Sequence, residues 1–534
     1  MNYVLKSQHI FTGLKDFTEP GAILIEDSLI KQVAPSIEEL TLRGDEQIID
    51  LGEQLITPGL HDFHVHLFTG ALQLVCVDLH DTKSADEVIQ KVKNYAANHT
   101  KAWIIGFGWD NGGWKVDTLP TKEMLDEHFP NRPVLLNHLE CHYCWVNSAA
   151  LELAEITATT KNPDFGEIVR ASNGEATGIL IEKAQDLVQK IAYSFSEEEK
   201  LSMLHAFFDL TARSGITSIN DMYAPFSEFL DDFSLLFQLE KEQKLKARVY
   251  LQPRMDGDLT EAHHFKQLYQ HPKIKMNGLK QFVDGVITGH TAYMVEPYAD
   301  ANHTGMTTYD LKAMKKWIIE ADKEGFSVRL HAIGDGAVKF SLDAFEEARR
   351  INGHMGTRHT IEHVECIQPE DVTRFKKLDV IASVQPYHIA ALEQKVYLER
   401  LGEKRFNRTY FSKTLLNSGA KVAFGSDFPV VSIDPMREIY HAVTRMDSTY
   451  RQQWGPDEKT TMAETLRAYT QIPAYGCFNE DKGGTIEAGK YADIVAFDRN
   501  LFSIAPKDIL TTKVSMTMLN GDIIFNRKPA SSLT

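Results

Sequence analysis

The chain has 534 residues, of which 43% are hydrophobic and 25% are charged. This composition supports a large buried core and excludes a disordered chain, a collagen-like repeat and a coiled-coil rod. The formal net charge of −17 argues against nucleic-acid or anionic-membrane partners, which bind clustered Lys and Arg, and says little about a small-molecule substrate. The 21 histidines direct attention to metal or acid–base chemistry.

The first 20 residues show no targeting segment, because no basic region precedes an apolar one. No run approaches the ~18 consecutive apolar residues of a transmembrane helix. The five cysteines are too few for a disulfide framework in a chain of this length. Cys141 and Cys144 form a CxxC motif without a second ligand pair nearby, so we interpret them as packing residues. These features predict a cytoplasmic protein.

Both ends of the chain have the pattern of short β-hairpins. Two apolar runs flank Asp27-Ser28, and Asn520-Gly521 separates two more near the C-terminus. We expect residues 1–57 and 478–534 to form one small, discontinuous β-sandwich domain.

Between the ends, a helix, a glycine and a short apolar strand follow one another repeatedly. Ser196 and Glu199 form a capping box for a helix that we expect to run to about Arg213, with Gly215 just past its end. Eight segments have the pattern of strands in such repeats: Leu55–His66, Ile216–Asp221, Ala247–Gln252, Met276–Asp284, Ser327–Gly334, His359–Val364, Val380–Gln385 and Lys421–Asp427.

Eight βα units predict an α/β fold of the TIM (β/α)8 barrel type within residues 58–477, with its chemistry at the carboxyl ends of the strands. The interval between the first two strands is too long for a single helix. We therefore expect an inserted subdomain at about residues 68–200, after the first barrel strand.

Candidate metal ligands lie at the ends of four of these strands. His64 and His66 are two residues apart in a strand, so their side chains face the same side. His331, His363 and Asp427 lie at the ends of the fifth, sixth and eighth strands. Each residue alone has an ordinary structural interpretation, such as a hydrogen-bonded core histidine or a helix cap. Five nitrogen and oxygen ligands on four strand ends of one barrel together predict a site for zinc or a related divalent ion.

The chain carries motifs that resemble those of the metal-dependent amidohydrolase superfamily: HDFHVH, HAIGDGAV, TIEHVE, SVQPYH and GSDFPV. Other segments are similar to the branch that contains the YtcJ-like hydrolases and N-substituted formamide deformylase (amidohydrolase family 3): GWD, LPTKEMLD, WVNSAAL, GILIEKA and KGGTIEAGKYADIVAFD. This resemblance covers essentially the whole chain. It implies an enzyme that cleaves a C–N bond other than a peptide bond, in an amide, an N-substituted formamide or a cyclic amide, by a metal-activated hydroxide. It also implies a possible homodimer.

The resemblance further implies one or two zinc-like ions and assigns their ligands. His64, His66 and Asp427 would bind one ion and His331 and His363 a second, with Lys280 bridging the two as a carboxylated lysine. A protonated lysine cannot bind a metal, whereas its carbamate offers two anionic oxygens. The alternatives for Lys280 are a plain salt bridge to a neighbour such as Asp284 and a mononuclear site without the carbamate.

Asp427 has a second expected role as the catalytic residue that accepts a proton and passes it to the leaving amine. Weaker candidates for contact with the substrate are His142, Tyr293, Gln385 and His388.

Deaminases of the superfamily usually carry a glutamate three residues after the fifth-strand histidine, and this position is Gly334 in the chain. We expect the neighbouring Asp335 to support the site, and hydrolysis of an amide-type bond to be favoured over ring deamination. Two other functions stay open, a mononuclear-metal deaminase of the same superfamily and a catalytically silent, ligand-binding regulatory barrel.

Overall fold

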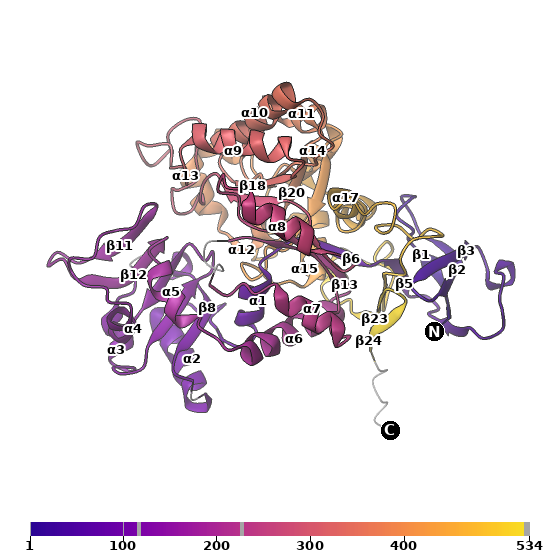
Figure 1. Cartoon of the computed structure of the whole chain (residues 1–534), viewed down its shortest axis with the longest axis horizontal. Coiled ribbons are helices and arrows are strands. Elements are labelled where there is room, and N and C mark those ends of the chain that lie inside the picture. Colours follow the sequence, from indigo (N-terminus) through magenta and orange to yellow (C-terminus); the bar gives the residue numbers. More distant parts are fainter. Residues whose placement is uncertain (1, 100, 115–118, 225–228, 528–534) are drawn as a thin grey trace.

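The computed structural model describes residues 2–99, 101–114, 119–224 and 229–527, which form three regions (Figure 1). Two central sheets, parallel except for the short β15 (Gln270–His271), are flanked on one side by a sheet from both ends of the chain and on the other by a sheet from residues 77–182. Within the described ranges, no helix is both long and apolar enough to cross a membrane.

Strands from both ends of the chain form one eight-stranded sheet, coloured indigo and yellow in Figure 1. The antiparallel pairing of β22 with β5 joins the two ends, and both expected hairpins are present. Asp27 and Asn520 each have φ of 54°, the left-handed conformation that such tight turns require. The strands are β1 (Tyr3–Ile10), β2 (Glu19–Glu26), β3 (Leu29–Ala34), β4 (Gln47–Asp50), β5 (Leu55–Pro58), β22 (Ile494–Phe497), β23 (Val514–Leu519) and β24 (Asp522–Asn526).

All eight segments expected between residues 55 and 427 contain strands, and these lie in two five-stranded sheets, except that the first segment is divided at Gly59 and its residues Leu55–Pro58 form β5 of the terminal sheet. The first has the order β15-β16-β14-β13-β6 and the second the order β17-β18-β19-β20-β21. Their strands are β6 (Leu60–Val65), β13 (Ile216–Met222), β14 (Arg248–Gln252), β15 (Gln270–His271), β16 (Ile274–Met276), β17 (Leu279–Phe282), β18 (Val328–Ala332), β19 (Thr360–His363), β20 (Ile381–Val384) and β21 (Lys421–Phe424).

The two central sheets meet at two seams. The strand expected over Met276–Asp284 is divided at Asn277-Gly278, so that β16 lies in one sheet and β17 in the other. A side chain at Gly278 would place its Cβ 2.7 Å from the carbonyl oxygen of Ser327, so the close approach of these two segments requires glycine. Single parallel bridges link the two sheets at the seams: Arg254, just after β14, pairs with Lys280, and Val65 pairs with Phe428.

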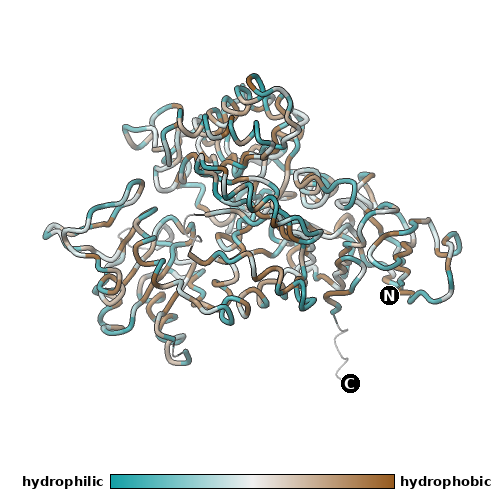
Figure 2. The backbone as a smooth tube through the Cα atoms, in the orientation of Figure 1, coloured by the Kyte–Doolittle hydropathy of each residue, from teal (hydrophilic) through white to brown (hydrophobic). Residues whose placement is uncertain are grey.

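Helices follow most of the central strands and cover the two sheets. The capping box at Ser196 and Glu199 is present, and its helix α6 ends at Arg213 before Gly215, whose φ is 75°. The helical parts of the tube alternate between hydrophilic and hydrophobic residues, as amphipathic helices with one face on a sheet do (Figure 2). The main helices here are α1 (Leu67–Gln73), α6 (Glu197–Arg213), α7 (Ser234–Lys241), α8 (Thr260–Leu268), α9 (Leu311–Lys323), α10 (Asp335–Asn352), α11 (Pro369–Leu378), α12 (His388–Ala391), α13 (Gln394–Phe406), α14 (Ser412–Asn417), α15 (Pro435–Thr444), α16 (Met462–Ala468), α17 (Gln471–Gly476) and α18 (Pro506–Ile509).

The segment between β6 and β13 builds a separate six-stranded sheet of order β11-β12-β10-β9-β8-β7, on the side of the molecule away from the terminal sheet (Figure 1). Trp109 and Trp145 are buried in its apolar core, so these two tryptophans serve packing. Its elements are β7 (Val77–Asp78), β8 (Ile104–Trp109), β9 (Val134–His138), β10 (Tyr143–Val146), β11 (Gly166–Arg170) and β12 (Ala176–Glu182), with helices α2 (Ala85–Asn98), α3 (Lys122–Asp126), α4 (Ser148–Leu153) and α5 (Asp186–Ala192).

Candidate metal centre

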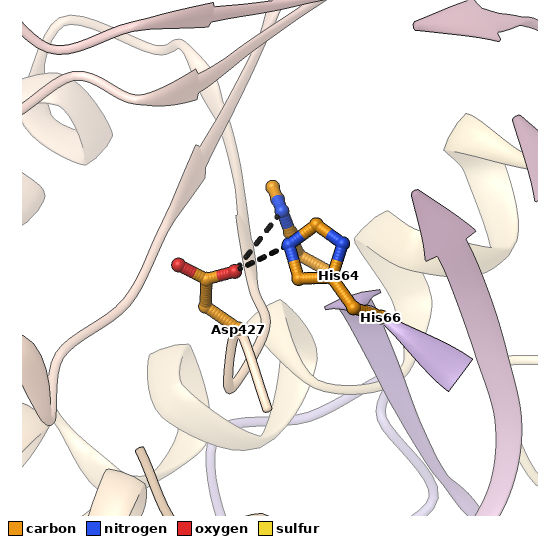
Figure 3. A group of neighbouring side chains, drawn as sticks. All are labelled: His64, His66 and Asp427. Carbon is orange, nitrogen blue, oxygen red and sulfur yellow. Dashed lines mark hydrogen bonds and ion pairs between the residues drawn. The ribbon is translucent and has the colours of Figure 1, made fainter. Parts of the chain in front are cut away.

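His64, His66 and Asp427 form a compact buried group where β6 and β21 end (Figure 3). Oδ1 of Asp427 lies 3.3 Å from Nε2 of His64 and 3.0 Å from Nε2 of His66. One ligand atom from each of the three residues lies within 4.8 Å of the other two. Two imidazole nitrogens and a carboxylate converging in this way suit a zinc-like divalent ion.

The chain brings Asp427 to His64 through a close contact between backbones. The amide N–H of Asp427 donates to the carbonyl oxygen of His64 at 2.7 Å, and φ of Asp427 is 60°. A Cβ at Gly425 would lie 2.5 Å from the amide nitrogen of His64. The glycine of the GSD motif therefore lets the end of β21 approach β6 closely enough for the group to form.

A second group of possible ligands uses the other oxygen of Asp427. Oδ2 lies 3.6 Å from Nε2 of His388 and 4.0 Å from Nδ1 of His363, and all three residues are buried. Nδ1 of His363 is also 2.9 Å from Oε1 of Gln385, an amide oxygen that can only accept. Thus Gln385 orients His363, and His388, a weak substrate-binding candidate by sequence, lies among the possible ligands.

His331 lies beside this second group but outside it. Its ring centroid is 4.4 Å from that of His363, and its Nε2 donates to the carbonyl oxygen of Gly285 at 3.1 Å. Phe282 stacks on the other side of the ring with centroids 4.7 Å apart. The structure thus places His331 next to the candidate ligands, but its Nε2 is hydrogen-bonded to the backbone. The role of His331 as a ligand of a second ion stays a prediction.

Lys280 is fully buried, and its amine has no hydrogen-bond partner among the described residues. The Nζ atom lies 4.2 Å from the centroid of the Phe282 ring. Burial lowers the pKa of Lys280 to about 8, although the negative charges of Glu362 and Asp427 oppose the shift. The alternative of a salt bridge to Asp284 is wrong in this structure. An unpartnered buried amine with a lowered pKa fits a lysine that reacts with carbon dioxide, because the neutral amine is the reactive form.

Glu362, which was not among the residues predicted from the sequence, completes the environment of His64. Its Oε2 accepts from Nδ1 of His64 at 2.7 Å, and its Oε1 accepts from Nε of Arg329 at 2.5 Å. Burial raises the pKa of Glu362, but the charges of Arg329 and His64 outweigh it and hold the pKa well below its usual range. The ionised carboxylate keeps the proton of His64 on Nδ1, which leaves Nε2 free for a metal.

Glu362 and His363 are consecutive, yet both reach the centre. In a regular strand they would point to opposite faces. His363 has φ of 72°, which ends the alternation at this residue. The sequence signal that could have identified Glu362 is the charged residue inside an otherwise apolar strand, in the TIEHVE motif.

The candidate metal ligands of both groups line a cleft of about 570 Å³, a volume that includes space open to solvent. Its polar wall contains Glu140, His142, Glu365 and His388. Nδ1 of His142 lies 2.9 Å from Oε1 of Glu182; burial lowers the pKa of His142, but the charge of Glu182 outweighs it and raises the pKa to about 9. Glu140 and Glu365 are further cleft residues that were not predicted from the sequence.

Tyr293, the last of the weak candidates, does not line the cleft. Its carbonyl oxygen accepts from the N–H groups of Gly336 and Ala337 at 3.0 and 3.1 Å. Oδ1 of Asp335 accepts from the amide N–H of Val295 at 2.9 Å, so Asp335 supports the loop that contains Tyr293. Both residues therefore hold the wall of the site in place.

These features, a buried His/Asp centre at the ends of parallel strands and a partly polar cleft above it, define the chain as an α/β protein with the site of a metal-dependent hydrolase. A model described as the amidohydrolase family matches residues 47–525, and the chain belongs to this family. The resemblance found in the sequence is thereby confirmed.

Three curated relatives match nearly the whole chain. It is 30% identical over 527 residues to Protein LONG AFTER FAR-RED 3 from Arabidopsis thaliana, covering 97% of this chain and 90% of that protein. It is 29% identical to the putative amidohydrolase YtcJ from Bacillus subtilis, covering 97% of this chain and 98% of that protein. It is 26% identical to N-substituted formamide deformylase from Arthrobacter pascens, covering 95% of this chain and 95% of that protein. Among solved structures, an uncharacterized metal-dependent hydrolase from Pyrococcus furiosus is 28% identical with a TM-score of 0.73, covering 94% of this chain and 100% of that one.

Proposed function

We propose that the chain is a metal-dependent enzyme that hydrolyses the C–N bond of an amide, an N-substituted formamide or a cyclic amide. The observation that carries this proposal is the convergence of His64, His66 and Asp427 at the base of the cleft. Similarity to N-substituted formamide deformylase along nearly the whole chain supports the choice of bond. Gly334, at the position of the deaminase glutamate, supports hydrolysis over ring deamination.

The proposal includes the arrangement of the fold. The bridges at the two seams support a (β/α)8 barrel built from both central sheets. The terminal sheet would be the small β-sandwich domain of residues 1–57 and 478–534, the barrel domain would span residues 58–477, and residues 68–200 would be its inserted subdomain.

The residues present fit one or two zinc-like ions. His64, His66 and Asp427 would hold the first ion, and His363 with His388 or His331 would hold the second, with the carbamate of Lys280 between them. A bound divalent ion would supply a Lewis acid for the carbonyl group and make bound water acidic enough to act near neutral pH. The unpartnered amine of Lys280 is the feature of this chain that favours two ions over one.

The protein's own residues would handle the proton. Asp427 faces both ligand groups, one oxygen toward each, and can accept a proton from water and pass it to the leaving nitrogen. Glu362 and Arg329 hold His64 in one tautomer while this happens. The apolar side chains of Leu139, Phe282 and Val286 in the cleft limit access of bulk water to the reacting groups.

A metal analysis combined with a substrate panel tests the proposal. We expect about two zinc-like ions per chain and metal-dependent release of an amine from at least one N-formyl, N-acyl or cyclic amide. Release of ammonia from a ring amine would favour the deaminase instead, and tightly bound metal without turnover of any compound would favour the silent barrel. A chain that binds no metal would overturn the proposal. Analytical ultracentrifugation of the same sample tests the expected homodimer.

A further inference from the structure

A second cavity of about 540 Å³ adjoins the metal-binding cleft. His142 and Phe282 line both spaces, so these two side chains form the wall that the cavities share. Phe282 also stacks on His331, which lines the first cleft. A substrate held at the metal centre could therefore extend past these two residues into the second cavity.

The second cavity lies between the inserted segment and the central sheets. Cys141, Phe165 and Lys183 come from the inserted segment, while Gln281 and Tyr309 come from β17 and the loop before α9. Together with Phe282, the aromatic rings of Phe165 and Tyr309 make much of the wall planar and apolar. Such a wall suits an aromatic ring, which gains by burial and by ring–ring contact.

Lys183 supplies a positive charge in this cavity. Its Nζ lies 5.1 Å from the ring centroid of Tyr309 and 3.5 Å from the Tyr309 hydroxyl, a loose contact across the two walls. In the part of the chain that the structure describes, Lys183 makes no ion pair within 4.0 Å. An aromatic cavity with an unpaired ammonium group suits an anionic ligand.

The acidic residues of the same wall do not neutralise Lys183. Glu182 pairs with His142, and Asp284 accepts from the backbone N–H groups of Tyr293, Ile333 and Gly334. Asp186 also lines the cavity and makes no ion pair with Lys183. The cation thus stays available to a ligand.

We propose that the second cavity binds the substituent of the amide substrate and selects an aromatic ring that carries a carboxylate, which pairs with Lys183. This inference rests on the proposed amide hydrolysis for its reaction, but the binding step stands apart from the chemistry. Lys183 is a specificity-determining residue in this scheme, and the metal centre acts on the amide in the first cleft.

The test compares two formamides that differ by one charge, 4-(formamidomethyl)benzoate and N-benzylformamide, in the metal-loaded enzyme. We expect kcat/KM to be ~10-fold higher for the carboxylate compound in the wild type, and Lys183→Met to bring the ratio of the two kcat/KM values to about 1. The matched control is Lys190→Met, an exposed lysine on the neighbouring helix α5. An equal preference in the wild type and in Lys183→Met would overturn the inference while leaving the proposed function standing.

Calorimetric titration with 4-methylbenzoate tests the cavity without turnover. Binding that weakens ~10-fold in Lys183→Met and not in Lys190→Met supports the site even if no amide is hydrolysed. Binding that is absent from the wild type, or equal in all three proteins, contradicts it.

Discussion

Oε2 of Glu362 accepts a hydrogen bond from Nδ1 of His64 at 2.7 Å, across 298 positions of the sequence. The other oxygen of Glu362 pairs with Arg329, whose guanidinium also donates to the carbonyl oxygen of Phe63 at 2.8 Å. Arg329 therefore contacts both the carboxylate that orients His64 and the backbone next to His64. This network sets the direction of His64 Nε2 before any ion is bound.

Glu362→Gln is expected to weaken metal binding ~10–100-fold, because the amide cannot fix the proton of His64 as the carboxylate does. The same change leaves the buried guanidinium of Arg329 without a negatively charged partner. The free energy of unfolding should therefore fall by about 3 kcal/mol. Competition with a chelator and thermal unfolding measure the two effects. Glu347→Gln, which changes a half-buried glutamate of α10 paired with Arg350, is the control, and equal metal affinity in both variants would contradict the role of Glu362.

Reconstitution of the metal-free protein tests Lys280. With the pKa of Lys280 lowered to about 8, a large share of the amine is neutral near pH 8 and can add carbon dioxide. We expect uptake of the second zinc ion to need bicarbonate and to increase from about pH 7 to pH 9. Lys280→Met should bind about one ion with or without bicarbonate, whereas Lys275→Met on β16 should behave like the wild type. Two ions in Lys280→Met would exclude the bridging carbamate.

Local signals predicted most of the fold because they depend on neighbours in the sequence. The capping box at Ser196 and the turn at Asn520-Gly521 determine their elements within a few residues. The divisions of two expected strands, at Gly59 and at Asn277-Gly278, were not foreseen, and the second depends on the approach of Ser327 from another strand. The pattern of apolar residues shows where a strand forms. Contacts between residues distant in sequence decide where its pairing with neighbouring strands is interrupted.

The sequence identified most of the residues of the candidate site, but it did not show which of them lie in contact with one another. Strand-end positions indicated His64, His66 and Asp427, and the structure brings them together. The grouping of His388 with Asp427 depends on the turn that starts α12, and the unpartnered state of Lys280 depends on burial by several elements. Neither property has a local sequence signal.

Asp427→Asn separates proton transfer from metal binding when it is assayed with the metal ion in excess. An amide side chain can still offer an oxygen ligand but cannot accept a proton, so kcat should fall on the order of 10²–10⁴-fold. Asp343→Asn, which alters a carboxylate paired with Arg374 on the surface, should retain wild-type kcat. Retained turnover in Asp427→Asn at full metal occupancy would refute the assignment.

His142 should make the stability of the protein depend on pH. Its pKa is raised in the folded protein from about 6.5 to about 9, so the protonated form is favoured by folding. The resulting stabilisation, on the order of 3 kcal/mol, is fully present below about pH 6.5 and is lost as the pH rises toward 9. Unfolding temperatures measured from pH 6 to pH 10 should show a smaller decline in His142→Gln than in the wild type. An identical decline in His142→Gln and in the exposed control His354→Gln would contradict the pairing with Glu182.

Gly334 occupies the deaminase glutamate position for a structural reason, and this gives a test of the reaction class. A Cβ at Gly334 would lie 2.1 Å from the carbonyl oxygen of Tyr293, a backbone atom that accepts from two N–H groups and cannot move away cheaply. We expect Gly334→Ala to lower the free energy of unfolding by about 2 kcal/mol or more. Gly289→Ala is the control in the same region, because its nearest atoms lie at 3.4 and 3.7 Å, which is ordinary contact. If Gly334→Ala unfolds at the same temperature as the wild type, the backbone has room for a side chain there, and the structural case against a deaminase glutamate fails.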